Sequence, residues 1–142
     1  MKKLLLAISF LTFSLSGYCD TLDYYHVYFN DSLIGKYNSI SERPVLELSE
    51  SDVQEDDMIT VRYGTDHPCV ECIYVLSVNI EVKEKTPEAE TTENFGKLSI
   101  PLKDLFYFRQ KYGIDSFYFN FHVRTTHTTP YRGTYLFELK FM

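Results

Sequence analysis

The segment 117-FYFNFHVR-124 carries the periodicity that decides the fold, because large apolar side chains occupy every second position. The apolar row consists of Phe117, Phe119, Phe121 and Val123, and the alternate row consists of Tyr118, Asn120, His122 and Arg124. Such period-two alternation predicts a β-strand with one face in the core and the other in solvent. Antiparallel sheets produce this pattern, whereas parallel sheets buried on both faces do not.

Further strands are expected on both sides of this segment, separated by turn residues. They span 22–30, 33–37, 44–48, 58–63, 73–82, 97–100 and 134–141. In 73–82 we expect Val75 on the outward row. In 134–141 we expect Tyr135 inward and Leu136 outward. The polar segment 83–94 contains no large apolar residue and is predicted to be a surface loop.

A short helix interrupts the strands over 101–112. Leu102, Leu105, Phe106, Arg109 and Tyr112 recur at helical spacing, and a glycine that suits a helix C-terminus follows at position 113. Two sheets packed face to face are the natural way to bury the apolar rows. We therefore predict an all-β, antiparallel β-sandwich with one short crossover helix near 101–112. Its layout resembles immunoglobulin-like or C2-like domains, although the chain has no Trp for the Cys…Trp…Cys signature.

The N-terminus has the pattern of a secretory signal peptide. Lys2 and Lys3 precede an apolar run over 4–15, and small residues follow near Cys19. We predict a signal peptide over 1–19, a single domain over 20–142, and a secreted or periplasmic location. The alternative is an envelope lipoprotein anchored through a lipidated Cys19, although Tyr18 is large for that processing. The apolar run is too short for a transmembrane segment.

The charge of the chain excludes some partners. The 142 residues include 14 basic and 20 acidic side chains, for a net charge of −6. Loss of Lys2 and Lys3 leaves 12 basic against 20 acidic residues, a net charge of −8. Such a domain is a poor partner for nucleic acid or anionic lipid, so a protein or carbohydrate partner is expected.

The motif 66-DHPCVEC-72 is the sharpest local feature, and three interpretations are open for it. Cys69 and Cys72 can form a disulfide that fixes the loop in an oxidising compartment. They can instead form a redox-active dithiol, although the predicted strand after Cys72 offers no helix N-terminus to activate a thiol. Finally, His67, Cys69 and Cys72 are possible metal ligands, with a fourth from His26, His122 or His127.

Aromatic and polar residues on the outward rows of two strands form a candidate binding surface. They are Tyr24, His26 and Tyr28 in the first strand, and Tyr118, Asn120, His122 and Arg124 in the strand quoted above. If those strands are neighbours, the rows form one polar aromatic surface suited to sugar stacking or a protein partner. The polar loop 125–132 is a further candidate.

No complete catalytic motif is present in the sequence, and no cofactor is expected. The leading hypothesis is therefore an exported β-sandwich that acts as a binding or interaction module, with a Cys69–Cys72 clip. The alternatives are a thiol oxidoreductase or metal-binding protein that uses the 67–72 loop, and a lipoprotein component of the envelope.

Overall fold

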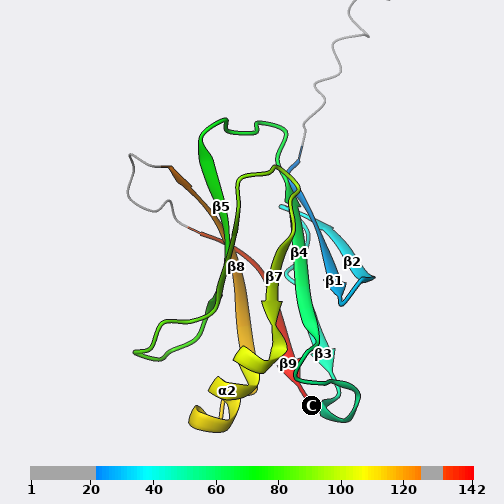
Figure 1. Ribbon diagram of the computed structural model, residues 1–142. Coiled ribbons are helices and arrows are strands. Elements are labelled where there is room, and N and C mark those ends of the chain that lie inside the picture. Colours follow the sequence, from blue (N-terminus) through cyan, green and yellow to red (C-terminus); the bar gives the residue numbers. More distant parts are fainter. Residues whose placement is uncertain (1–21, 126–132) are drawn as a thin grey trace, which may run out of the picture.

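The computed structural model describes residues 22–125 and 133–142, which form two β-sheets packed face to face (Figure 1). The strands are β1 Tyr24–Phe29, β2 Ser32–Asn38, β3 Val45–Leu48, β4 Met58–Gly64, β5 Cys72–Asn79, β6 Glu88–Thr91, β7 Leu98–Pro101, β8 Ser116–Thr125 and β9 Thr134–Phe141. One sheet has the order β2-β1-β4-β7 and the other β3-β9-β8-β5-β6. The predicted all-β sandwich is confirmed. The predicted signal peptide with Cys19, and His127 in the loop 125–132, lie outside the described residues.

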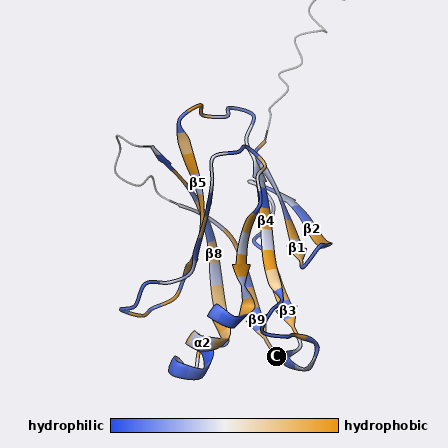
Figure 2. Ribbon diagram, viewed as in Figure 1, coloured by the Kyte–Doolittle hydropathy of each residue, from blue (hydrophilic) through white to orange (hydrophobic). Residues whose placement is uncertain are grey.

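The strand quoted above has the predicted register. Phe117, Phe119 and Phe121 are buried, whereas Tyr118 is 43% exposed. The ring of Phe119 stacks on Phe137 of β9 with centroids 4.5 Å apart. Figure 2 shows that hydrophobic residues concentrate in the strands, while the long loops are mostly hydrophilic. The alternating apolar rows of both sheets therefore build the core between the layers.

Helix α2, Leu102–Tyr112, crosses from β7 in one sheet to β8 in the other, as predicted, and covers one end of the core (Figure 1). It ends at Gly113, whose φ of 68° is left-handed and whose N–H donates to the Arg109 carbonyl. Its buried residues are Leu102, Leu105 and Phe108. The predicted stripe was therefore partly wrong, because Tyr112 is exposed and Phe106 is only half-buried.

Two strands depart from the predicted layout, and both lie at sheet edges. After β2 the chain crosses to the other sheet, where β3 runs in the same direction as β9 and pairs with it in parallel. β6 lies inside the segment 83–94 that was predicted to be a loop, and it pairs with β5. An edge strand needs backbone hydrogen bonds but few apolar side chains, so composition did not reveal β6.

Val75 was predicted to face outward into solvent but is fully buried. It lies on the outer face of β5, opposite Glu90 of β6 and His122 of β8. Arg124 of β8 makes an ion pair with Glu90 of β6. Because β5 lies between these two strands, that ion pair crosses β5 on the face where Val75 projects.

A β-bulge in β9 reverses the predicted parity at its start. Phe119 pairs with Phe137, but Asn120 pairs with Tyr135, so Leu136 is the extra residue. Leu136 is consequently buried and Tyr135 lies on the outer face with Asn120, the opposite of the prediction. The buried Tyr25 hydroxyl of β1 donates to the Leu136 carbonyl at 2.8 Å, which joins the two sheets at the bulge.

In the part of the chain that the structure describes, no helix has the length and apolar character needed to cross a membrane.

Candidate functional site: an aromatic and cationic sheet face

The outer face of the four-stranded sheet displays the first half of the predicted binding surface. Tyr25 and Val27 of β1 are buried, so Tyr24, His26 and Tyr28 project from the opposite face. His26 lies opposite Lys36 of β2 and opposite Arg62 of β4. One histidine ring is thus flanked by a cation on each neighbouring strand.

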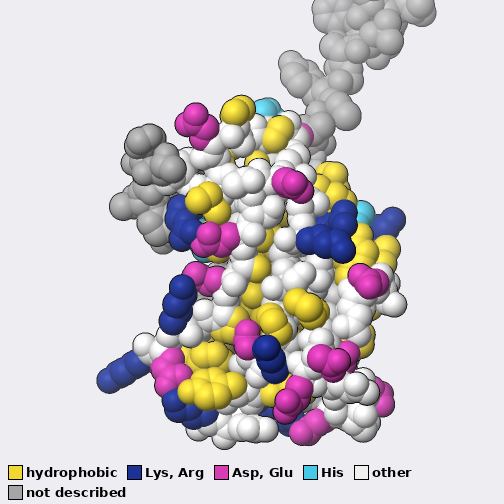
Figure 3. All heavy atoms as spheres, viewed as in Figure 1, with side chains coloured by type: hydrophobic (Ala, Val, Ile, Leu, Met, Phe, Trp, Pro, Cys, Tyr) yellow, Lys and Arg dark blue, Asp and Glu magenta, His cyan; other side chains and the backbone are white. Residues whose placement is uncertain are grey.

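Phe95, from the connection between β6 and β7, completes this face. Its ring centroid lies 5.3 Å from that of Tyr24 and 5.0 Å from that of His26, edge-on to the imidazole. The Arg62 guanidinium lies 5.8 Å from the Phe95 centroid and 6.0 Å from the Tyr28 centroid. We name Tyr24, His26, Tyr28, Arg62 and Phe95 the aromatic–cationic patch. Figure 3 shows Lys and Arg side chains gathered with hydrophobic side chains and a histidine over β1, β2 and β4.

The backbone holds Phe95 in a conformation that an aromatic residue rarely adopts. Its φ is 61°, and its N–H donates to the Tyr63 carbonyl at 2.9 Å. A non-glycine residue in this left-handed region costs about 1–3 kcal/mol and persists only where its surroundings enforce it. Such strain is concentrated at functional sites, so it marks Phe95 as a candidate functional residue.

The neighbouring residue Asn94 ties the Phe95 loop to the disulfide loop. The Thr65 N–H donates to Asn94 Oδ1 at 3.0 Å, and Asn94 Nδ2 donates to the Thr65 carbonyl at 3.0 Å. Gly96 then closes a turn, with its N–H donating to the Glu93 carbonyl. These bonds support the left-handed conformation of Phe95 from both sides.

The positive charge of the patch and its surroundings comes from Arg62, Lys36 and Lys97 rather than from His26. Partial burial, with smaller contributions from Lys36 and Arg62, lowers the pKa of His26 below its usual 6.5. His26 is therefore mostly neutral at neutral pH. Within residues 22–125 and 133–142, Lys36, Arg62 and Lys97 make no ion pair with a carboxylate. Their charges remain available to a ligand.

A polar hollow of about 250 Å³ adjoins the patch beside the Tyr28 ring. Its lining residues are Tyr28, Asn30, Asp31, Thr60, Arg62 and Lys97. It continues into a second hollow of about 460 Å³ that shares Asn30, Asp31, Thr60 and Lys97. The face therefore combines flat aromatic rings with hydrogen-bonding groups at one end.

Cys69 and Cys72 lie at disulfide distance, with their sulfur atoms 1.97 Å apart. Cys72 is buried at the start of β5, whereas Cys69 is exposed in the loop, where its N–H donates to the Tyr74 hydroxyl at 3.1 Å. The exposed ring of His67 pairs instead with Asp66 at 2.8 Å. Among the described residues, no group of three or more His, Cys, Asp or Glu side chains is arranged to hold a metal ion.

The second half of the predicted binding surface lies elsewhere. Tyr118, Asn120, His122 and Arg124 are on β8 in the five-stranded sheet, so the two rows occupy opposite outer faces of the sandwich. The condition for one continuous surface, that the two strands are neighbours, is therefore not met. His122 is half-buried, and that burial lowers its pKa. The Arg124 guanidinium is already paired with the Glu90 carboxylate.

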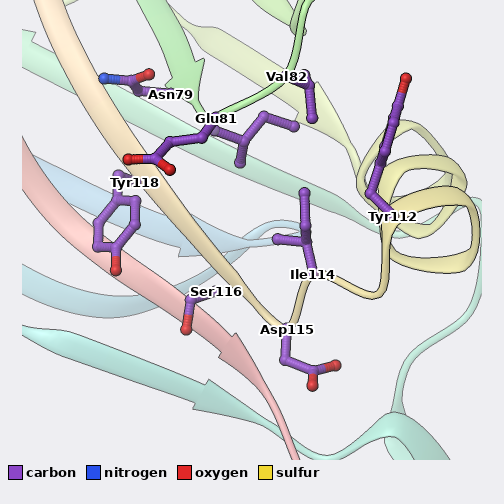
Figure 4. Close-up of a pocket in the computed structure, with 9 residues that line it drawn as sticks. Asn79, Glu81, Val82, Tyr112, Ile114, Asp115, Ser116 and Tyr118 are labelled. Atoms are coloured by element: carbon purple, nitrogen blue, oxygen red, sulfur yellow. The ribbon is translucent and has the colours of Figure 1, made fainter.

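Two hollows flank the β8 row. The larger, of about 580 Å³, lies between the end of β5, the start of β8 and Tyr112 of α2, and Tyr118 lines it (Figure 4). Its charged lining residues are Glu81 and Asp115. Asn120 and His122 line the other hollow, of about 350 Å³, together with Glu88. These sites are acidic or polar, and neither gathers aromatic rings with unpaired cations as the aromatic–cationic patch does.

Sequence reasoning missed Arg62 and Phe95 of the patch, and Lys36 beside it. Arg62 and Lys36 could have been found from strand pairing, because they occupy outward positions on strands next to β1. Phe95 carries a weaker signal: it is a single large apolar residue between Asn94 and Gly96, two turn-forming residues.

Comparison with known proteins found no family model, no curated sequence and no solved structure that matches this chain.

Proposed function

We propose that this protein is an exported binding module and that its ligand contacts the aromatic–cationic patch. The observation that carries the proposal is the strained Phe95, which places its ring against Tyr24, His26 and Arg62 on an exposed sheet face. A conformation that costs free energy and holds a half-buried ring on an outer sheet face is expected where the ring contacts a ligand. Aromatic and arginine side chains are also the residue types enriched at binding surfaces.

Export rests on the N-terminal pattern and on the cysteine pair. The basic start, the apolar run and the small residues before Cys19 are typical of a signal peptide. Two cysteines at disulfide distance fit an oxidising compartment, outside the cytoplasm. Mass spectrometry of the processed N-terminus tests this part, because an intact N-terminus in the exported fraction contradicts cleavage. A lipid mass on Cys19 would identify the lipoprotein alternative.

Binding through the patch is tested with glycan and peptide arrays probed by three forms of the protein. The forms are wild type, Tyr24→Ala and Tyr118→Ala. Tyr24 and Tyr118 are each 43% exposed, but only Tyr24 belongs to the patch, so Tyr118→Ala is a matched control. We expect ligands that wild type and Tyr118→Ala retain and that Tyr24→Ala loses. Identical retention by all three forms contradicts the proposal.

A thiol oxidoreductase is the second candidate, and one observation favours it. Cys69 is exposed while Cys72 is buried, so only one sulfur is open to attack by a substrate thiol. Against it, Cys72 begins a strand, so no helix N-terminus lowers the thiol pKa. Reduction of insulin by dithiothreitol, accelerated by wild type but not by Cys69→Ser, would support this candidate. No acceleration by wild type would eliminate it.

A further inference from the structure

We propose that the aromatic–cationic patch binds an acidic polysaccharide, with sugar rings on the aromatic side chains and sugar carboxylates at Arg62. This inference rests on the proposed function and adds the chemical class of the ligand. It follows from three features of the face: its unpaired cations, its exposed or half-buried rings, and the polar hollow beside Tyr28.

The first feature is charge complementarity. The whole chain has a net charge of −6, yet Lys36, Arg62 and Lys97 share this face. In the described part of the chain, none of the three has a carboxylate partner. An anionic ligand is repelled by most of an acidic surface and attracted here, which directs it to this face. A guanidinium also binds a carboxylate in a bidentate manner, which fixes the ligand's orientation.

The second feature is the arrangement of rings on an open sheet face. Tyr24, Phe95, His26 and Tyr28 follow one another with adjacent centroids 5.0 to 6.4 Å apart. Neighbouring rings are inclined to each other by 45° to 85°, so the row offers separate ring faces and edges along β1, and an extended chain can place one sugar ring against each accessible face. Rings provide such contact area at low entropic cost.

The third feature is the polar hollow at the Tyr28 end. The Asp31 carboxylate lies there beside one aromatic ring and two cations. Asn30 and Thr60 also line the hollow, although the Asn30 amide already bonds Asp57 and the Met58 N–H, and the Thr60 hydroxyl bonds Ser99. A volume of about 250 Å³ lies below the roughly 300–1,000 Å³ of sites that enclose a whole drug-sized ligand, so it fits one small polar ring. A sugar has this combination of an apolar ring face and hydroxyl edges, whereas an acidic peptide has no ring hydroxyls for these groups.

The charges also give the ligand a direction. Asp31, Asp56 and Asp57 line the second hollow beyond Lys97, so a carboxylate is disfavoured at that end. Asp57 accepts hydrogen bonds from Asn30 and from the Gln54 N–H, which lower its pKa and keep it ionised. The sugar carboxylate is therefore assigned to Arg62 on the side of the aromatic rings, and uncharged hydroxyl groups to the second hollow, which Asp56 and Asp57 line and Arg62 does not.

The experiment measures binding of polygalacturonate and alginate by affinity electrophoresis, with fully methyl-esterified polygalacturonate and poly-glutamate as comparison probes. The ester removes the negative charge and keeps the sugar chain, while poly-glutamate keeps the charge and removes the sugar. The variants are Tyr24→Ala and Arg62→Gln. Arg43→Gln is the matched control, because Arg43 stacks on Tyr135 at 4.8 Å on the opposite sheet.

We expect wild type to bind at least one of the two polyuronates and to bind the ester and poly-glutamate more weakly. Arg62→Gln should weaken polyuronate binding about tenfold or more, and added salt should weaken binding by wild type. Tyr24→Ala should also weaken binding, whereas Arg43→Gln should not. Unchanged melting temperatures would show that the variants are folded.

Several outcomes overturn the inference, and they separate it from the proposed function. Equal binding of the ester shows that the protein does not recognise the negative charge of the polysaccharide. Equal binding of poly-glutamate, unaffected by Tyr24→Ala, shows simple ion exchange. Absence of binding to both polyuronates rejects the ligand class. If the arrays still yield ligands that depend on Tyr24, only the ligand class fails; if no array ligand depends on Tyr24, the proposed function fails as well.

Discussion

Replacing Phe95 with alanine and, separately, with glycine distinguishes the contribution of its ring from the cost of its backbone conformation. Both changes remove the ring contacts with Tyr24, His26 and Arg62. Only glycine adopts a φ of 61° without a steric penalty. The two variants should therefore lose the same ring contacts but differ in their free energy of unfolding.

The magnitudes follow from the contacts. Each aromatic pair contributes about 0.5–1.5 kcal/mol, so loss of the two ring pairs lowers the free energy of unfolding by about 1–3 kcal/mol in both variants. Alanine keeps the conformational penalty of about 1–3 kcal/mol, whereas glycine removes it. Glycine loses about 0.4–1 kcal/mol through greater freedom of the unfolded chain. We expect Phe95→Gly to be more stable than Phe95→Ala by about 1 kcal/mol.

The assay is urea unfolding at equilibrium, with Thr92→Ala and Thr92→Gly as the matched pair. Thr92 is exposed in the same connection and does not have a positive φ, so alanine should be the more stable substitution there. Inversion of this order at position 95 alone supports a strained Phe95. If Phe95→Ala is at least as stable as Phe95→Gly, the reasoning from strain to function is refuted.

Three further predictions concern stability. Tyr25→Phe should lower the free energy of unfolding by about 1–3 kcal/mol, because it leaves the buried Leu136 carbonyl without its donor; an unchanged urea midpoint would contradict this link between the sheets. The Cys69→Ser/Cys72→Ser double variant should lose about 2 kcal/mol or less, because the ring is short, and a much larger loss in urea would contradict a local clip. The pKa of His26 is lower in the folded protein than in the unfolded chain, so on acidification the unfolded chain binds a proton at His26 before the folded protein does. The free energy of unfolding should therefore fall as the pH drops below about 6.5, and this fall should end once the pH is below the folded-state pKa. His26→Asn should reduce this fall in pH-dependent melting, and an identical fall would contradict it.

The sequence was sufficient to predict the strands that bury an apolar row. In β8 a large apolar residue occupies each second position from Phe117 to Val123, so the register could be predicted from the pattern alone. The helix over 102–112 was likewise marked by its spacing and by Gly113. These elements are specified locally, by side chains that must avoid water.

The sequence was insufficient where tertiary pairing decides the outcome. β6 consists of Glu88–Thr91 and is a strand only because β5 offers it hydrogen-bonding groups. The bulge at Leu136 shifts the parity of β9 through pairing with β8, which no local pattern reveals.

Only half of the candidate site could be predicted, again because strand pairing decides which residues meet. Tyr24, His26 and Tyr28 were found because alternation places them outward, but their neighbours depend on strand order. Only the pairing of β1 with β2 and β4 brings in Lys36 and Arg62. The rows on β1 and β8 were grouped on their similar composition, whereas the topology places them in different sheets.

The most direct test of the patch as the binding surface is a titration of ¹⁵N-labelled protein with oligogalacturonate, followed by NMR. We expect the largest amide shifts in β1, in β4 and around Phe95, and small shifts along β8. Shifts concentrated on β8, or in the hollow that Tyr112 and Tyr118 line, would contradict the assignment of binding to the four-stranded sheet.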